Sequence, residues 1–362
     1  MFVKRNILLT PGPVTTTEKV KMAQVVPDIC PRENEFTDLI TTINEGLIKI
    51  VDERALDYVC TLLGGSGTAV VETILVSVVG EESCVLILNN GAYGKRMVRI
   101  AEIHGLNFIE YKSSDREKID IQDIKRNILN DNNKITHIAV VHHETTTGVL
   151  NDLDEIGLLA KDFGLELLVD AISSFGAIHI DMNNMGISHL AATSNKNLQG
   201  MAGAGFIISK ITSIEKIKNY KKKSLYLNLY DQYQYFLSTG QFRFTPPVQT
   251  LYALREAIDE LKKETIEGRY SRYSQSWETL VNGMRNLGFS QYVPLKNQSK
   301  LICTFYEPDN FNFNDFHDYL YERGITIYPG KILNKNTFRI GTIGDIDYND
   351  IEYLLKCIKE YL

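Results

Sequence analysis

The stretch ELLVDAISSFG at residues 166–176 and the stretch HLAATSNKNLQGMAGAGFIIS at residues 189–209 decide how this chain folds. Each begins with a short apolar run and continues into small residues that favour a turn. Apolar runs of this kind are typical of strands that helices bury on both faces. The first run ends in Asp170, and Lys196 follows the second. Both stretches therefore predict a buried strand that delivers a charged side chain.

The same pattern recurs between about residues 55 and 210, where apolar runs alternate with helical patterns. The predicted strands are 58–63, 84–88, 136–141, 166–170, 189–193 and 205–209, and the predicted helices between them include 67–79, 92–104 and 152–163. Repetition of strand, helix and strand indicates an α/β fold with a mostly parallel, doubly wound sheet.

The pattern changes after the segment FTPP at residues 244–247, where long helical patterns run to about residue 287. The last part mixes predicted strands at 300–305, 325–328 and 338–341 with predicted helices at 314–323 and 348–361. This order is typical of a separate small α+β unit. We predict an N-terminal arm at 1–15, a large domain at 16–255 and a small C-terminal domain at 256–362.

Composition narrows the function classes. A net charge of -6 and a pI near 5.7 argue against nucleic-acid binding, because no basic excess exists to displace counterions from phosphates. The five cysteines are scattered and form no CxxC pair, so neither a disulfide framework nor a zinc site is expected. The charged N-terminus and the lack of a long apolar run argue against export and membrane insertion. We therefore expect a cytoplasmic protein with reduced thiols.

Ligands of an open parallel sheet bind beyond the carboxyl ends of its strands. The first predicted strand runs into GGSGT at residues 64–68, which could direct backbone N–H groups and two hydroxyls at a phosphate. An ordinary tight turn with Ser66 or Thr68 capping the helix explains this segment equally well. Tyr93 follows the second strand and could stack on a flat cofactor, although a core position is also plausible.

The third strand ends in HHETTTG at residues 142–148, which superficially resembles a metal cluster. Adjacent strand residues point to opposite faces, so His142 and His143 are not expected to share one ion. The fourth strand ends in Asp170, whose burial would be costly unless a cation or a donor meets it. A protonated pyridine nitrogen would do so, whereas a helix-capping role is the alternative.

Lys196 follows the next strand and precedes small residues, so its amine could reach into the crevice and form an imine with an aldehyde. Most lysines are surface groups, but the neighbours Ser194 and Asn195 and the glycine-rich return favour a special backbone path. A phosphate turn, an aromatic ring, a strand-end acid and this lysine at one sheet edge are together the groups that pyridoxal 5'-phosphate requires.

Seven segments carry a family resemblance: LLTPGPV (8–14), CPRE (30–33), GSGT (65–68), HHETTTG (142–148), DAISSFG (170–176), SNK (194–196) and QFRFTPP (241–247). Together they resemble the class V aminotransferases of fold type I, and within them the 2-aminoethylphosphonate:pyruvate transaminases. The resemblance covers essentially the whole chain. Ile172 and the pair Asn197–Leu198 depart from the pattern of that subfamily.

The resemblance implies a role for each matching residue. Lys196 would hold the cofactor aldehyde as a Schiff base, Asp170 would pair with the pyridine nitrogen, and Tyr93 would stack on the ring. The phosphate would be held by Ser66, Gly67 and Thr68, joined by Thr245 from the other subunit of a homodimer. Thr145 and Asn195 would lie beside the ring. Ile172, although it departs from the subfamily pattern, is also expected among the cofactor-binding residues. Arg339 would bind the carboxylate of the keto acid. From residue type alone, Arg32 and Arg243 are further candidates for binding the acid groups of the substrates.

The implied reaction transfers the amino group of 2-aminoethylphosphonate to pyruvate and yields phosphonoacetaldehyde and L-alanine. An alanine:glyoxylate or serine:pyruvate aminotransferase would share every cofactor residue. A cysteine desulfurase would need a reactive thiol, and Cys303 within the predicted strand 300–305 is expected to be buried and inert. A non-catalytic binding protein on the same scaffold would carry no visible chromophore.

Overall fold

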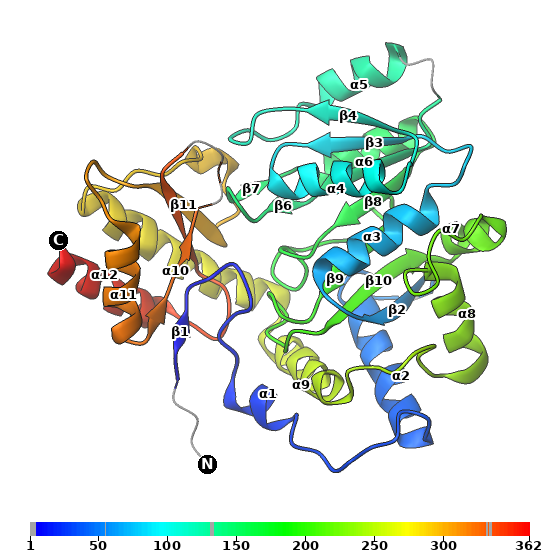
Figure 1. Cartoon of the computed structure of the whole chain (residues 1–362), viewed down its shortest axis with the longest axis horizontal. Helices are drawn as coiled ribbons and strands as arrows, with labels where there is room; N and C mark the ends of the chain where they lie inside the picture. Colours follow the sequence, from blue (N-terminus) through cyan, green and yellow to red (C-terminus); the bar gives the residue numbers. More distant parts are fainter. Residues whose placement is uncertain (1–4, 55, 131–133, 331, 333–334) are drawn as a thin grey trace.

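A computed structural model describes residues 5–54, 56–130, 134–330, 332 and 335–362. Residues 1–4 of the predicted N-terminal arm lie outside the described residues. Figure 1 shows a large α/β body and a smaller body that contains the C-terminus. No helix in the described part of the chain is both long enough and apolar enough to cross a membrane.

A seven-stranded sheet organises the large body. Its order is β2 (Tyr58–Gly64), β10 (Ala204–Lys210), β9 (Ile187–Thr193), β8 (Glu166–Asp170), β5 (His137–Val141), β3 (Val85–Asn89) and β4 (Phe108–Lys112). Strand β10 runs antiparallel to both of its neighbours, and the other pairings are parallel. The predicted mostly parallel sheet is therefore confirmed.

Helices cover both faces of this sheet (Figure 1). One face packs against α2 (Asn34–Lys49), α5 (Ile121–Asn130), α6 (Leu153–Asp162) and α9 (Val248–Glu264), and the other against α3 (Gly67–Val78), α4 (Ala92–Ile103), α7 (Ile211–Lys216) and α8 (Leu229–Thr239). Alternate residues of one strand enter the two cores: Leu86 and Leu88 face one, Val85 and Ile87 the other. This double burial explains why the strands read as continuous apolar runs.

The smaller body has its own core and its own sheet. Its strands are β11 (Ile302–Tyr306), β14 (Thr337–Gly341) and β13 (Tyr328–Pro329), and its helices are α10 (Ile266–Asn286), α11 (Phe313–Glu322) and α12 (Tyr348–Tyr361). The predicted boundary between residues 255 and 256 falls inside α9, whose Leu261 still packs in the large core. The helix ends where Thr265 adopts a φ of 64°. The chain therefore passes from the large core to the small core at Thr265.

The N-terminal arm joins the two bodies. Strand β1 (Ile7–Leu8) pairs in parallel with β12 (Ile325–Thr326) of the small body, and the amide of Gly341 donates to the carbonyl of Leu9. The chain then crosses to the large body and continues into α1 (Glu18–Met22), which packs against α9. The remaining short elements are β6 (His143–Glu144), β7 (Val149–Leu150) and two 3-10 turns, Ile217–Asn219 and Leu295–Asn297.

Candidate active site

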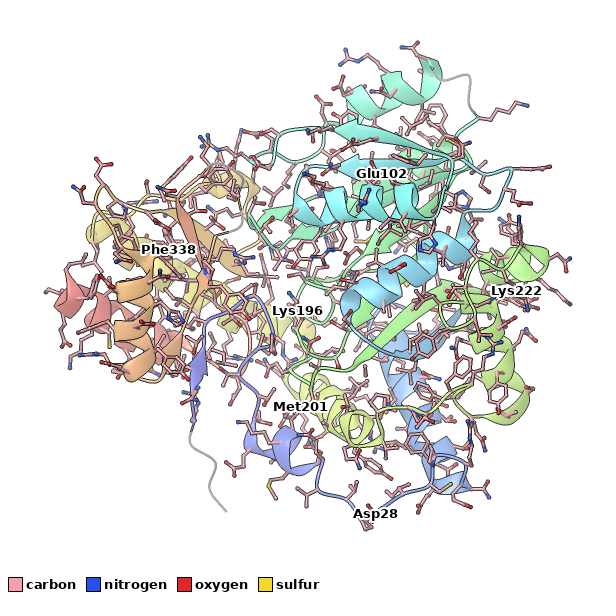
Figure 2. The ribbon with its side chains drawn as sticks, in the orientation of Figure 1. Asp28, Glu102, Lys196, Met201, Lys222 and Phe338 are labelled. Carbon is pink, nitrogen blue, oxygen red and sulfur yellow. The ribbon has the colours of Figure 1, made fainter. Side chains whose placement is uncertain are left out.

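Lys196 lies where the carboxyl edge of the large sheet meets the small body, near the middle of the molecule in Figure 2. The side chain is buried, with 9% of its surface exposed. Its amine donates a hydrogen bond to the carbonyl of Pro11, in the N-terminal arm. A Cβ atom on Gly12 would lie 2.7 Å from Cδ of Lys196, so only glycine lets the arm pass this close. The arm thus forms one wall around the lysine.

The turn that carries Lys196 is held from α10. Arg269, 1% exposed, donates from Nη1 to the carbonyl of Asn197 at 2.6 Å. Gln199 adopts a φ of 63°, a conformation that is costly for a residue with a side chain, and its Nε2 donates to the hydroxyl of Tyr273 at 2.6 Å. Strained backbone persists where surrounding contacts over-determine it, and it clusters at functional sites. The predicted special path around Lys196 therefore has a structural basis in these two clamps.

Burial governs the charge of Lys196. Removal from water lowers the pKa of its amine to about 8, although the nearby carboxylate of Asp170 acts in the opposite direction. The positive charges of Arg339 and Arg96 lower this pKa further. A lysine with such a pKa can release its proton near neutral pH.

Asp170 ends β8 and is also buried. Its Oδ1 accepts the amide N–H of Ile172 at 2.9 Å. Among the described residues Lys196 acts on it electrostatically, but the Lys196 amine donates its hydrogen bond to Pro11. Burial raises the pKa of this carboxyl to about 6, despite the lowering effects of that N–H group, Lys196 and Arg96. A buried acid that lacks a bound cation is suited to receive one from a ligand.

The predicted phosphate turn leads into α3, which begins at Gly67. Ser66 stands at the N-cap position, and its side chain makes no capping hydrogen bond. The first N–H groups of the helix therefore remain available for an anion. Ile172 packs against this turn, because a Cβ atom on Gly67 would lie 2.7 Å from its Cδ1. Ile172 thereby links the turn to the segment that follows Asp170.

Glu144 holds the backbone at Tyr93, whose ring is predicted to stack on the cofactor, and the sequence analysis did not identify this role. Its carboxylate accepts the amide N–H of Gly94 at 2.8 Å and that of Tyr93 at 3.1 Å, at the start of α4. Burial raises the pKa of Glu144 to about 7, although these N–H groups act to lower it. An acid three residues beyond the end of a buried apolar strand, as in HHETTTG, is the signal that could have revealed this role.

Arg339 on β14 brings the small body to the site. It is 2% exposed, and its guanidinium donates to the carbonyls of Pro329 at 3.3 Å and Thr145 at 3.4 Å. Burial lowers the pKa of Arg339, and no carboxylate among the described residues forms an ion pair with it. A buried guanidinium with only carbonyl partners can still bind an acid group. The structure thus brings Lys196, Asp170, Thr145 and Arg339 into one region.

Arg32, Arg243 and Thr245 lie on or against one segment of the chain, which passes beside the end of β2 and away from Lys196. Arg32 donates to the carbonyl of Phe242 at 2.6 Å, and Arg243 donates to Leu225 and lies 3.2 Å from a carboxylate oxygen of Asp231. Thr245 is exposed on the same segment. None of the three contacts Lys196, Asp170 or Arg339 within the described part of the chain, and Asn195 is half-buried beside Lys196.

The two histidines of HHETTTG form separate hydrogen bonds. His142 Nδ1 lies 2.9 Å from the hydroxyl of Ser174, and His143 Nε2 lies 2.8 Å from the hydroxyl of Ser299. Burial lowers the pKa of His142 to about 3 and that of His143 to about 4, so both rings are neutral near pH 7. Each ring forms a hydrogen bond to a serine hydroxyl on another loop near the site. Cys303 is buried, and burial raises the pKa of its thiol well above the ordinary value, which leaves it protonated and unreactive.

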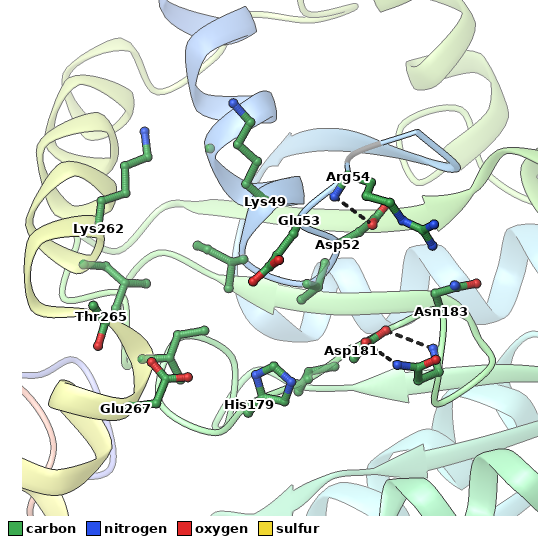
Figure 3. A pocket seen from close by; sticks show the side chains of 17 residues that line it. Lys49, Asp52, Glu53, Arg54, His179, Asp181, Asn183, Lys262, Thr265 and Glu267 are labelled. Carbon is green, nitrogen blue, oxygen red and sulfur yellow. Dashed lines mark hydrogen bonds between the residues drawn. The ribbon is translucent and has the colours of Figure 1, made fainter.

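A cavity of about 970 Å³ lies at the opposite edge of the sheet, before β2 and β9. Figure 3 shows that Lys49, His179, Lys262 and Glu267 line it together with other polar residues. Its charges are of both signs, and none of the predicted site residues borders it. The size of this cavity does not by itself indicate a reaction. The carboxyl edge of the sheet is the better candidate for the active site, because it combines a buried amine, a buried acid and a buried guanidinium.

The residues at the carboxyl edge fit pyridoxal phosphate. The buried carboxyl of Asp170 would meet a ring nitrogen, the Lys196 amine an aldehyde, and the free start of α3 a phosphate group. The ring of Tyr93 is half-buried at the same edge and offers a surface for stacking.

Comparisons with known proteins agree with this chemistry. The family model described as Aminotransferase class-V matches residues 22–342. A 2-aminoethylphosphonate--pyruvate transaminase from Phocaeicola vulgatus is 41% identical over 357 residues, which are 98% of this chain and 98% of that protein. One from Bacillus cytotoxicus is 39% identical and is covered to 97%. Alanine--glyoxylate aminotransferase from Nostoc sp. superposes with a TM-score of 0.91 at 24% identity, over 99% of this chain and 96% of that one, which supports the fold alone.

Proposed function

Because the chain belongs to the class-V aminotransferases, a family of pyridoxal-phosphate enzymes, we propose that it transfers the amino group of 2-aminoethylphosphonate to pyruvate. The products would be phosphonoacetaldehyde and L-alanine. Relatives that carry this activity in their names are 39% and 41% identical over nearly the whole chain. The carbon skeletons of both substrates stay intact, so the protein has to move one amino group and the protons that accompany it.

The observation that carries the proposal is the buried amine of Lys196, which lies within electrostatic reach of both Asp170 and Arg339. Pyridoxal phosphate, when bound, supplies a ring that accepts the electron pair left behind when a proton leaves the substrate carbon. Lys196 would take that proton from the substrate carbon and deliver a proton to the cofactor carbon that carried the aldehyde, which its lowered pKa permits near pH 7. Asp170 would keep the ring nitrogen positively charged and so strengthen the ring as an electron acceptor.

Arg339 would hold the acid group of each substrate in turn. A guanidinium presents planar donors that match both a carboxylate and a phosphonate. Its present partners are two carbonyl groups at 3.3 and 3.4 Å, which an anion could replace without leaving a buried charge unpaired. Arg32 and Arg243 remain proposed helpers, and they could reach a site only by way of a second copy of the chain.

We also propose a homodimer, in which Thr245 of one subunit joins the phosphate site of the other. Thr245 is exposed, and its segment lies beside the end of β2, where the hydroxyl of Tyr226 donates to the carbonyl of Gly64 at 2.7 Å. Leu225 next to Tyr226 leaves 71% of its surface exposed, which favours burial against another subunit. We also propose a cytoplasmic location, which the free thiols of Cys30, Cys60, Cys303 and Cys357 support.

The test measures alanine formed from pyruvate with 2-aminoethylphosphonate as the amine, beside matched reactions with serine and with the pair alanine and glyoxylate. We expect the phosphonate to give the highest kcat/KM. A higher kcat/KM for serine, or for alanine with glyoxylate, would replace the proposed reaction by the corresponding aminotransferase. Absence of a visible chromophore after addition of pyridoxal phosphate would instead indicate a binding protein without this chemistry.

A further inference from the structure

Arg96 contacts two parts of the predicted cofactor site, although it has no role in the proposed function. It lies on α4, one turn after Tyr93. Its Nη1 donates to the hydroxyl of Thr68 at 3.1 Å, and its Cζ lies 4.6 Å from the centre of the Tyr93 ring. Its guanidinium therefore contacts both the predicted phosphate turn and the predicted stacking ring.

The charge of Arg96 extends into the site. It contributes to lowering the pKa of Lys196, after burial, and it opposes the burial that raises the pKa of Asp170. None of the described carboxylates forms an ion pair with Arg96. Arg99 on the same helix differs, because it pairs with Glu102 at 2.9 Å. Arg96 is therefore a cation without a neutralising partner at the edge of the site.

The residues so far assigned to the phosphate group are all uncharged: Ser66, Gly67, Thr68 and Thr245. A phosphate monoester carries between about -1.5 and -2 charges at pH 7. Hydroxyls carry no charge and a helix N-terminus supplies only about half a positive charge, so together they orient such an anion but compensate only part of its charge. Arginine presents five donors in a planar fork, and a single donor of Arg96 is engaged with Thr68.

We propose that Arg96 is the cation that binds the phosphate group of the cofactor, with the hydroxyl of Thr68 shared between the guanidinium and the phosphate. An oxygen that accepts a hydrogen bond from Thr68 would be next to the remaining donors of Arg96. The same guanidinium would stay over the Tyr93 ring and fix the phosphate end of the stacked cofactor. This assignment depends on the cofactor and not on which amine is the substrate.

The experiment compares pyridoxal phosphate with pyridoxal, which has the same ring and aldehyde but no phosphate. Cofactor-free full-length protein would be titrated with each compound, and the dissociation constant read from the visible absorption of the bound form. Arg96→Gln should weaken the binding of pyridoxal phosphate by about 10- to 100-fold, as expected for a lost hydrogen bond to a charged group. The binding of pyridoxal should change by less than about twofold.

Two variants make the titration specific. Arg99→Gln, on the same helix and already paired with Glu102, should leave both dissociation constants within about twofold of the wild-type values. Arg96→Lys keeps the charge and should recover part of the lost affinity. Because Arg96 is exposed, both of its variants are expected to fold, and the thermal unfolding midpoint checks this.

Two results would overturn the assignment. Equal losses of affinity for pyridoxal phosphate and pyridoxal would mean that Arg96 acts through the Tyr93 ring and not on the phosphate. An unchanged affinity for pyridoxal phosphate with a raised KM for 2-aminoethylphosphonate would assign Arg96 to the substrate. The titrations can be interpreted even when no alanine is formed, so a failure of the proposed reaction is distinguishable from a failure of this assignment.

Discussion

Strand β8 begins with one acid and ends with another, and their pKa values are shifted in opposite directions. Glu166, at the amino end, accepts hydrogen bonds from the amine of Lys216 and, at 2.6 Å, from the hydroxyl of Ser213. Burial alone would raise the pKa of Glu166, but these donors lower it. At the carboxyl end, burial raises the pKa of Asp170 to about 6, because only a backbone N–H group donates to it.

Glu166 is therefore a structural acid, whereas Asp170 is suited to bind a ligand. Glu166 is satisfied by its own chain, and the Lys216 side chain that meets it remains 62% exposed. Lys196 is buried, and it donates to the carbonyl of Pro11 and not to Asp170. Both ends of the strand thus have an acid and an amine. At the carboxyl end, within the part of the chain that the structure describes, the acid and the amine do not pair with each other. A cofactor with a cationic ring nitrogen and an aldehyde would supply a partner for each.

The largest expected effect is the difference in activity between variants of the two lysines. Lys196→Ala should reduce alanine formation by more than about a thousandfold, because the substitution removes the group that transfers the proton. Lys216→Ala, its counterpart at the other end of the strand, should leave kcat/KM within about twofold and cost about 1 kcal/mol, because Lys216 is 62% exposed and Glu166, 18% exposed, keeps its hydrogen bond from Ser213. Steady-state kinetics and denaturant unfolding of the two variants would be compared. Near-wild-type activity of Lys196→Ala would remove the basis of the proposed reaction.

Variants of the two acids should also differ, in both activity and stability. Asp170→Asn should lower kcat by about 10²- to 10⁴-fold, a range typical of groups that act electrostatically on the reaction. The cofactor-free variant should nevertheless be at least as stable as wild type near pH 7, because a buried unpaired charge is removed. Glu166→Gln should leave kcat unchanged and lower the free energy of unfolding by about 1–2 kcal/mol, because charged hydrogen bonds are lost. If the two variants behaved alike, the distinction between the two ends of β8 would be wrong.

The pH dependence of stability should differ in sign between the two edges of the sheet. The pKa of Asp170 is raised when folded, so its stabilising contribution is present below pH 3.8 and is lost as the pH rises towards 6. Burial lowers the pKa of His137 and His189 at the amino edge to about 4, so their contribution is present above pH 6.5 and is lost as the pH falls. Relative to wild type, Asp170→Asn should therefore gain up to about 3 kcal/mol of unfolding free energy between pH 4 and pH 6.

Unfolding of the cofactor-free proteins by denaturant at several pH values measures this difference. Glu166→Gln is the control, because the pKa of Glu166 is lowered and its effect with pH has the opposite sign. A constant difference between Asp170→Asn and wild type across this range would show that Asp170 is already ionised and partnered in the folded chain.

The sequence predicted the strands and the two charged ends because the relevant information is local. Continuous apolar runs mark doubly buried strands, and the charged residue that ends a run or follows it within a few positions marks the carboxyl edge, which is how Asp170 and Lys196 were located. Strand β4 was missed because it forms the edge of the sheet and its residues Glu110 and Lys112 are exposed. Its pattern resembles that of a surface loop.

The remaining site contacts could not be predicted because they join distant segments. Arg269 reaches the Lys196 turn across 72 positions, and the Pro11 carbonyl across 185. Neither partner has a local pattern that distinguishes it from an ordinary surface arginine or a proline turn. Arg32 and Arg243 were predicted from residue type alone, and within one chain they bind other groups. Periodicity therefore identifies strand ends, whereas contacts between distant residues require the tertiary structure.

Glu144 provides a third acid, intermediate between the two ends of β8, and the smallest expected effect. It is buried like Asp170 but accepts two backbone N–H groups, and its pKa is still raised to about 7. Glu144→Gln keeps a carbonyl oxygen for Gly94 and should change the free energy of unfolding by less than about 1 kcal/mol at pH 7. Because the pKa is raised in the folded state, the variant should gain stability relative to wild type as the pH rises from 4.5 to 7.

The matched variant Glu144→Ala removes both acceptors at the start of α4 and should cost about 1–3 kcal/mol, because two N–H groups lose their partner. It should also weaken cofactor binding more than Glu144→Gln does, since Tyr93 is then no longer held by its amide. If Glu144→Gln proved as damaging as Glu144→Ala, the negative charge itself would be required at this position. Backbone donors would then suffice to keep a buried acid ionised, and the lack of a side-chain cation at Asp170 would no longer distinguish the carboxyl end of β8 from the amino end.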